Sequence, residues 1–254
     1  MFVMDMKKFL YFAIGLALVA GCKNRVKSAQ PQEEEVVVEE DMTVEPQDTV
    51  VAILQAQTLP EEPVFDIVTN MGTIRVKLYK DTPRHRDNFE KLAISGYYDS
   101  TLFHRVINGF MIQGGDPFTK DTAKVAQYGE GGPAYTIPAE MRDEAGNPLH
   151  RHKKGALAAA RVGDLANPFK ASSGSQFYLV QNPDNCIHLD GEYSVFGETV
   201  AGLNVIDKIA AVATDRLDRP KADVRILSIR PNKELNEIEK NKEFGTEFAE
   251  ENDE

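Results

Sequence analysis

Residues 103–117, FHRVINGFMIQGGDP, place one arginine within a mostly apolar stretch. Arg105 is followed by Phe110, Met111 and Gln113, so a charged donor, apolar side chains and an amide stand close together in the sequence. A guanidinium stays protonated and presents its donors in a fixed fork, which allows it to stabilise a polar group without transferring a proton. We therefore expect a guanidinium at the rim of an apolar pocket. The alternative is a pair of strands with an exposed arginine and a glycine turn.

The remaining reactive residue types do not form a recognisable catalytic or metal-binding set. His150 and His152 have cationic neighbours and no paired carboxylate ligand, so we expect no metal site and no cofactor. His104 should point to the opposite face of its strand from Arg105, and we expect it to be a buried, hydrogen-bonded structural histidine. Cys186 has no evident basic partner and is interpreted as incidental.

The elements that must position Arg105 are short strands and two helices. Alternating apolar residues around Asn70-Met71-Gly72 predict a hairpin over 65–78, and apolar spacing after Thr82-Pro83 predicts a helix that stops at Gly96. A second helix is expected near GLNVIDKIAAV. Strands are predicted at LFHRV, FMIQ, GALAAA, SQFYLV, YSVFGE and ADVRILSIR. Many short antiparallel strands with two helices indicate a barrel or a sandwich.

Four separated blocks of this sequence resemble the cyclophilins, a family of peptidyl-prolyl cis/trans isomerases. They are FHRVINGFMIQGGDP, GALAAAR, SSGSQFYLV and HLDGEYSVFGE, and they occur in the order that the family has them. The resemblance covers essentially all of residues 63–231. It implies a mainly β fold, a closed eight-stranded antiparallel β-barrel capped by two α-helices.

The resemblance also assigns roles to residues. Arg105 matches the catalytic arginine, with Phe110 and Gln113 in the same catalytic group. The residues expected to bind substrate are Met111, Ala160, Arg161, Gln176, Tyr178, Leu189 and Tyr193. Strand alternation independently places Gln176 and Tyr178 on one face and Phe177 on the other, so Phe177 should belong to the core.

Several positions depart from the usual pattern of the family. Asn108 stands where proline is common, and His188 stands where many members have a tryptophan that contacts cyclosporin. Arg161, Tyr178 and Tyr193 replace a common Asn, Phe and His. The roles of these last three are therefore less firmly implied than that of Arg105.

The implied function is acceleration of rotation about Xaa-Pro bonds in exported, proline-containing polypeptides, the activity classed as EC 5.2.1.8. The alternative is a domain that holds proline-containing segments, as a holdase or envelope scaffold, without turnover.

The charge distribution separates a nearly neutral domain from acidic flanks. The 254 residues carry a net charge of −11, which divides into +1 in residues 1–22, −7 in residues 23–62, +1 in residues 63–230 and −6 in residues 231–254. Nucleic-acid binding is not expected, because no part offers a basic face. Residues 23–62 have too few apolar residues to form a core, so we expect them to be an acidic, disordered tether. Residues 232–254 form a charged tail with a weak helical pattern.

Residues 1–22 resemble a bacterial lipoprotein signal. Lys7-Lys8 precedes an apolar run that is too short to span a bilayer, and Leu18-Val19-Ala20-Gly21 leads to Cys22, the expected lipidation site. The expected location is the bacterial cell envelope, with a lipid anchor, facing the periplasm or on the cell surface. The alternative is an ordinary signal peptide with an incidental cysteine. Only Cys186 would then remain beyond Cys22, so no internal disulfide can form.

Overall fold

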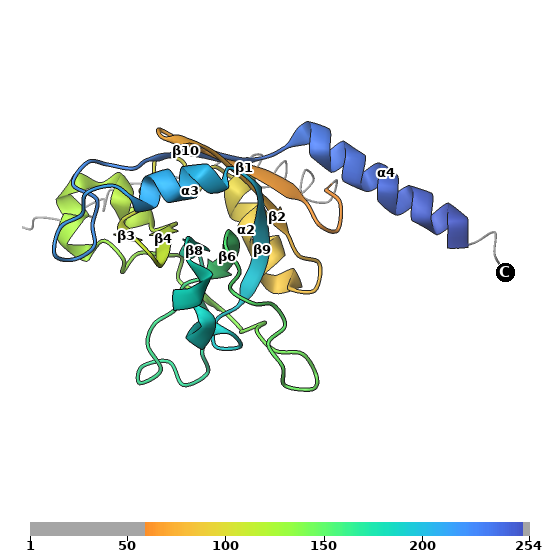
Figure 1. Cartoon of the computed structure of the whole chain (residues 1–254), viewed down its shortest axis with the longest axis horizontal. Coiled ribbons are helices and arrows are strands. Elements are labelled where there is room, and N and C mark those ends of the chain that lie inside the picture. Colours follow the sequence, from red (N-terminus) through yellow and green to blue (C-terminus); the bar gives the residue numbers. More distant parts are fainter. Residues whose placement is uncertain (1–58, 251–254) are drawn as a thin grey trace, which may run out of the picture. The chain divides into compact units, whose positions relative to one another are not determined.

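The computed structural model describes residues 59–250 of the chain, and the side chains of residues 59–243 (Figure 1). The predicted signal segment, Cys22 and most of the predicted tether lie outside these residues.

Eight strands form one antiparallel sheet, in the order β10-β1-β2-β9-β6-β8-β4-β3. β5 and β7 form a separate two-stranded sheet, which the sequence did not predict. The strands are β1 (Val64–Thr69), β2 (Gly72–Leu78), β3 (Arg105–Ile107), β4 (Met111–Gly114), β5 (Thr136–Ile137), β6 (Ala156–Ala159), β7 (Ser172–Ser173), β8 (Phe177–Val180), β9 (Val195–Ala201) and β10 (Ile226–Pro231).

The expected closed barrel is wrong in one respect, because the sheet is open between its edge strands β3 and β10. The segment before β3 meets the start of β10 through an isolated bridge between Leu102 and Arg225 and a hydrogen bond from Phe103 N–H to Val224 O at 2.9 Å. Ile226, the first residue of β10, also accepts from Ser100 N–H at 2.9 Å and donates to Thr101 O at 2.8 Å. Further along, the N–H of Val106 donates to Asp218 O, which belongs to a loop. The short β3 therefore turns away from β10 before a regular ladder can form.

The two predicted helices are present, and a third α-helix follows them in the described part of the chain. The α-helices are α2 (Pro83–Ile94), α3 (Leu203–Ala210) and α4 (Lys233–Glu250), and the short 3-10 helices are η1 (Pro117–Lys120), η2 (Thr122–Gln127), η3 (Pro183–Asn185) and η4 (Ile187–Leu189). α2 begins with proline in its first turn, where a missing N–H costs nothing. Its buried face includes Phe89 and Leu92. Both α2 and α3 pack on the main sheet (Figure 1).

The core is built around aromatic rings held between α2 and the sheet. Phe89 lies 5.8 Å from Phe65, 5.3 Å from Tyr98 and 5.7 Å from Phe177, measured between ring centroids. Edge-on and tilted contacts of this kind stabilise a core beyond the apolar area that they bury. Phe177 is fully buried in this cluster, which confirms the prediction from strand alternation.

Strands β3, β4, β8 and β6 present two different faces. Val106, Ile112 and Phe177 point into the main core, while their neighbours Met111 and Tyr178 belong to a second, smaller apolar cluster. The alternation follows from the two-residue repeat of a strand. These four strands therefore serve as one wall of the core and carry a second set of side chains on the other face.

Parts of the predicted tether and tail contact the domain. Leu59 packs against the core, and Lys77 forms an ion pair with Glu62 at 2.7 Å. In α4, the buried amide of Asn236 accepts from Val64 N–H at 2.6 Å and donates to Val64 O at 3.0 Å. This side chain satisfies both polar groups of the first β1 residue, so the start of α4 is fixed to the sheet.

Glu90 is a buried carboxyl group on α2. The nearest cationic atom recorded for it is Arg86 Nε at 3.7 Å, beyond hydrogen-bond distance. Burial is the main cause that raises its pKa from 4.5 to about 7.

This shift predicts a stability that depends on pH. Since the folded state holds the Glu90 proton more tightly than the unfolded state, its stabilising effect is complete below the unfolded pKa and is lost as pH rises toward about 7. We expect Glu90→Gln to raise the free energy of unfolding by about 3 kcal/mol at about pH 8 and to change it little at about pH 4. Urea denaturation at both pH values measures this, with the exposed Glu144→Gln as control. An equal gain at both pH values would contradict the prediction.

Candidate active site

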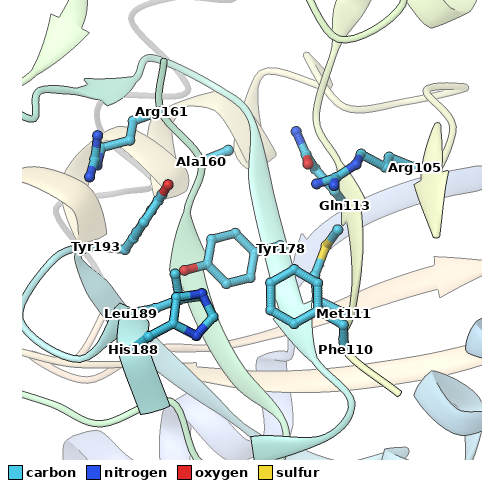
Figure 2. Close-up of a pocket in the computed structure, with 10 residues that line it drawn as sticks. All are labelled: Arg105, Phe110, Met111, Gln113, Ala160, Arg161, Tyr178, His188, Leu189 and Tyr193. Atoms are coloured by element: carbon cyan, nitrogen blue, oxygen red, sulfur yellow. The ribbon is translucent and has the colours of Figure 1, made fainter. Parts of the chain in front are cut away.

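A cavity of about 280 Å³ lies on the second face of β3, β4, β8 and β6 (Figure 2). Nine of the ten catalytic and substrate-binding residues expected from the sequence line it, and His188 joins them. The lining residues are Arg105, Phe110, Met111, Gln113, Ala160, Arg161, Tyr178, His188, Leu189 and Tyr193. Gln176, the tenth expected residue, lies in an adjacent cavity.

Strand register brings the polar residues of the cavity together. Arg105 on β3 is paired with Gln113 on β4, and Gln113 is paired with Tyr178 on β8. Directly paired residues on one face of a sheet hold their side chains side by side. Figure 2 shows the Arg105 and Gln113 side chains next to each other at one side of the cavity.

The guanidinium of Arg105 is available to a ligand. The side chain is 43% exposed, and the Asp218 carboxylate lies 3.6 Å from Nε, too far for a hydrogen bond. Among residues 59–243, no hydrogen bond occupies its terminal nitrogens. Asp218 was not among the residues expected from the sequence, because it lies in a distant loop without a recognisable motif. The Asp218 carboxylate can orient Arg105 through Nε and leave the terminal nitrogens of the guanidinium available to a ligand.

Apolar side chains form the floor and one wall of the cavity. Met111 is fully buried, and Leu189 is nearly so. The Phe110 ring lies nearly parallel to His188, with centroids 6.4 Å apart. The cavity therefore combines one free cationic fork with a compact apolar surface, as residues 103–117 led us to expect.

Arg161 has a different environment from Arg105. Its side chain is only 4% exposed, and the guanidinium lies over the Tyr193 ring at 4.3 Å. Its Nε donates to the backbone oxygen of Glu192 at 3.1 Å, and its hydrogen bond to Asp164 lowers the pKa of that carboxyl group. The Arg161 guanidinium is thus engaged within the protein, and it holds the Tyr193 ring in place.

Gln176 supports the cavity from behind. Its amide oxygen accepts from Gln113 Nε2 at 3.0 Å, and its own nitrogen donates to Gly129 O at 2.9 Å and Gly131 O at 2.7 Å. The adjacent cavity, of about 650 Å³, shares Gln113, Ala160 and Arg161 with the first. Gln176 therefore fixes Gln113, which lines both cavities, and the loop of residues 129–131, which lines the adjacent one.

His104 is buried as expected, but the predicted hydrogen bonding is wrong. Neither ring nitrogen has a hydrogen-bond partner among the described residues. Burial lowers its pKa, so the ring is neutral. Strand alternation correctly placed the ring on the core side, but a partner from elsewhere in the fold could not be inferred from it.

The other histidines and Cys186 take part in separate contacts. His150 Nε2 lies 2.8 Å from Asp81, and His152 contacts Asp190 and Tyr178. No group of three potential metal ligands occurs among the described residues. Burial raises the pKa of the Cys186 thiol to about 11, so it is protonated and unreactive at neutral pH.

A family model described as cyclophilin type peptidyl-prolyl cis-trans isomerase/CLD matches residues 64–231. Among similar proteins, peptidyl-prolyl cis-trans isomerase-like 1 of Neurospora crassa is 38% identical over 165 residues, covering 65% of this chain and 91% of that protein. The mouse (Mus musculus) protein of the same name is 35% identical over 173 residues, covering 68% and 94%.

Solved structures of the same type are also similar. A cyclophilin type peptidyl-prolyl cis-trans isomerase from Cryptosporidium parvum aligns with a TM-score of 0.57 and 28% identity, covering 67% of this chain and 98% of that one. A second structure of that protein, in the presence of the dipeptide Ala-Pro, aligns with a TM-score of 0.56 and 28% identity, covering 66% and 98%.

The contacts of Gln176 predict its effect on ligand binding. Gln176→Leu would remove the support of Gln113 and leave the two glycine carbonyls without their donor. We expect the Kd for a proline peptide, measured by NMR titration, to rise about tenfold, the equivalent of one lost hydrogen bond to a positioned group. The control is Gln127→Leu, at an exposed position in η2. An unchanged Kd in a folded Gln176→Leu variant would show that Gln113 needs no such support.

Proposed function

The chain belongs to the cyclophilin-type peptidyl-prolyl cis-trans isomerase family, and we propose that it accelerates Xaa-Pro rotation in exported proteins with Arg105 as the catalytic group. Its enzyme class is peptidyl-prolyl cis-trans isomerase, EC 5.2.1.8. The observation that carries the proposed mechanism is the free guanidinium of Arg105 beside the apolar cavity.

The reaction needs only a weakening of amide resonance. The peptide C–N bond resists rotation by about 18–20 kcal/mol because the nitrogen lone pair is delocalised into the carbonyl group. A donor directed at the prolyl nitrogen stabilises the twisted state, in which the lone pair is localised. Arg105 can supply this donor without changing its protonation state.

The other lining residues bind and orient the substrate in this proposal. Phe110, Met111 and Leu189 accept the proline ring on their apolar surface, and the Gln113 amide holds the substrate backbone close to the Arg105 fork. No proton is transferred in any step. The role of the protein is to hold the bond where one positive group can act on it.

The required stabilisation is within reach of such a site. Bringing a process that takes tens of seconds down to milliseconds is roughly four decades of rate, or about 5–6 kcal/mol. A charge-assisted hydrogen bond in a site that excludes water, together with positioning, can supply this amount.

Holding of extended polypeptides is a second candidate function, and one observation favours it. The loop that follows Arg161 exposes three apolar side chains, with Val162 65%, Leu165 103% and Phe169 88% exposed. The loop is internally ordered, since Asn167 bonds both backbone groups of Ala171 through its side chain. Exposed apolar groups beside a peptide site can bind unfolded segments that contain proline.

Arg105→Lys tests the proposed catalyst. The variant keeps the positive charge but loses the planar fork, so we expect kcat/KM for a proline peptide to fall about 100-fold. Exchange NMR on the peptide measures cis/trans interconversion without a coupled protease. Arg84→Lys, at an exposed position of α2, is the control.

An unchanged rate in Arg105→Lys would refute the assignment of Arg105 as the catalyst. Binding of the peptide to the wild-type protein without faster exchange would instead support the holding function.

We further propose that the protein is a bacterial lipoprotein anchored to the cell envelope through Cys22. The basic start, the short apolar run and the small residues before Cys22 support this proposal. The acidic segment that follows would separate the domain from the membrane surface. Within residues 59–250, no helix has the length and apolar character needed to cross a bilayer.

Cys22→Ser tests the anchor in the host cell. Without the thiol no lipid can be attached, so we expect the full-length protein to move from the detergent phase to the aqueous phase in detergent partitioning. The control is Cys186→Ser, which leaves Cys22 intact. Retention of Cys22→Ser in the detergent phase would rule out lipid attachment at that residue.

A further inference from the structure

A buried hydrogen-bond relay lies behind the Tyr178 ring. The Tyr178 hydroxyl is 2.8 Å from His152 Nε2, and His152 Nδ1 is 2.9 Å from Asp190 Oδ1. The same carboxylate oxygen accepts from the backbone N–H of His152 at 2.8 Å. The His152 side chain is completely buried, so water does not compete for its ring nitrogens, while the Asp190 side chain is 17% exposed.

The protonation states give the relay a direction. Burial raises the pKa of Tyr178 well above its usual value, so the phenol keeps its proton and can donate it. Burial also lowers the pKa of His152, so its ring is neutral at pH 7 and carries one proton. That proton belongs on Nδ1, which faces the Asp190 carboxylate, and Nε2 then accepts from the Tyr178 hydroxyl.

His152 connects three elements that contribute to the cavity. It precedes β6, its ring contacts Tyr178 on β8, and Asp190 directly follows η4. η4 carries His188 and Leu189, which both line the cavity. Tyr178 in turn contacts the Tyr193 ring edge-on, with centroids 6.1 Å apart. The His152 side chain thus links β8 to the end of η4, and both of these elements contribute residues to the cavity.

We propose that His152, oriented by Asp190, is a positioning residue that fixes the Tyr178 ring and η4, with Leu189, as a wall of the proline pocket. It acts through Tyr178 and does not itself touch the substrate. This inference rests on the proposed function of the cavity as a proline site.

The relay matters to binding because a buried tyrosine hydroxyl needs a partner. Without an acceptor at position 152, the hydroxyl would be unsatisfied, and the ring would have to move toward water to recover a hydrogen bond. The route open to it is the cavity, which borders the same ring. Phenylalanine at 178 has no hydroxyl and would stay in place without His152.

A double-mutant cycle between His152 and Tyr178 tests the proposal through the Kd of a proline peptide. His152→Asn keeps an amide group where Nδ1 lies but has no atom at Nε2, so we expect the Kd to rise about tenfold. Tyr178→Phe, which removes the hydroxyl from a lining residue, supplies the reference Kd for the second arm of the cycle. The double variant His152→Asn/Tyr178→Phe should match Tyr178→Phe, because the hydroxyl that needs the histidine is gone.

Two further variants separate positioning from general stability. His152→Gln carries an amide that reaches the Nε2 position and should restore the Kd to within about threefold of wild type. His150→Asn alters a neighbouring histidine that pairs with Asp81 and does not line the cavity, so it should have no effect. The proposal would be overturned if His152→Asn weakened binding by the same factor in the wild-type protein and in the Tyr178→Phe variant. A purely structural role of His152 would not depend on the Tyr178 hydroxyl.

A measurement on the wild-type protein keeps the proposal falsifiable if His152→Asn does not fold. We expect ¹⁵N NMR to show His152 protonated at Nδ1 and unprotonated at Nε2 at about pH 7. A proton on His152 Nε2 would overturn the proposal, because this nitrogen could then not accept from the Tyr178 hydroxyl. Because the cycle measures binding, an absence of faster cis/trans exchange in the wild-type protein would count against the catalytic function and leave the test of the relay intact.

Discussion

The pairing of β4 with β3 on one side and β8 on the other is the constraint on which the site depends. It sets Arg105 opposite Gln113, and Gln113 opposite Tyr178. The same register sends Val106 and Ile112 into the core. A slip of one residue would exchange the two faces, burying a guanidinium and exposing apolar side chains. The energy of the core therefore fixes the geometry of the site.

The two arginines of the cavity show how the surroundings determine what a charged side chain can do. Arg161 is covered by Tyr193 and bound to Asp164 and a backbone oxygen, so its donors serve the fold. The Nε of Arg105 lies 3.6 Å from the Asp218 carboxylate, and within residues 59–243 no hydrogen bond engages its terminal nitrogens. Arg161 therefore contributes to a rigid wall of the cavity, and Arg105 is the guanidinium that can act on a ligand.

Much of the fold and of the cavity lining could be predicted from the sequence, because alternation and short motifs are local signals. Alternation separates Phe177 from Tyr178, and the blocks of sequence identify nine residues that the structure brings together. Contacts between distant segments carry no such signal. Three features depend on loops whose paths are set by packing: the open edge beside β3, the stacking of Arg161 on Tyr193, and the ring of His104, which has no hydrogen-bond partner in the described part of the chain.

The pair of histidines at 150 and 152 illustrates the same limit, because identical side chains two residues apart have different environments. His150 stacks on Tyr79 and pairs with Asp81 near the surface, while His152 is fully buried between Asp190 and Tyr178. A buried tyrosine hydroxyl in place of the more common phenylalanine requires an acceptor, and a buried histidine requires a group that fixes its proton. His152 supplies the acceptor for the Tyr178 hydroxyl, and Asp190 fixes the proton of His152. Tyrosine at 178 is thus explained by residues that lie far from it in the sequence.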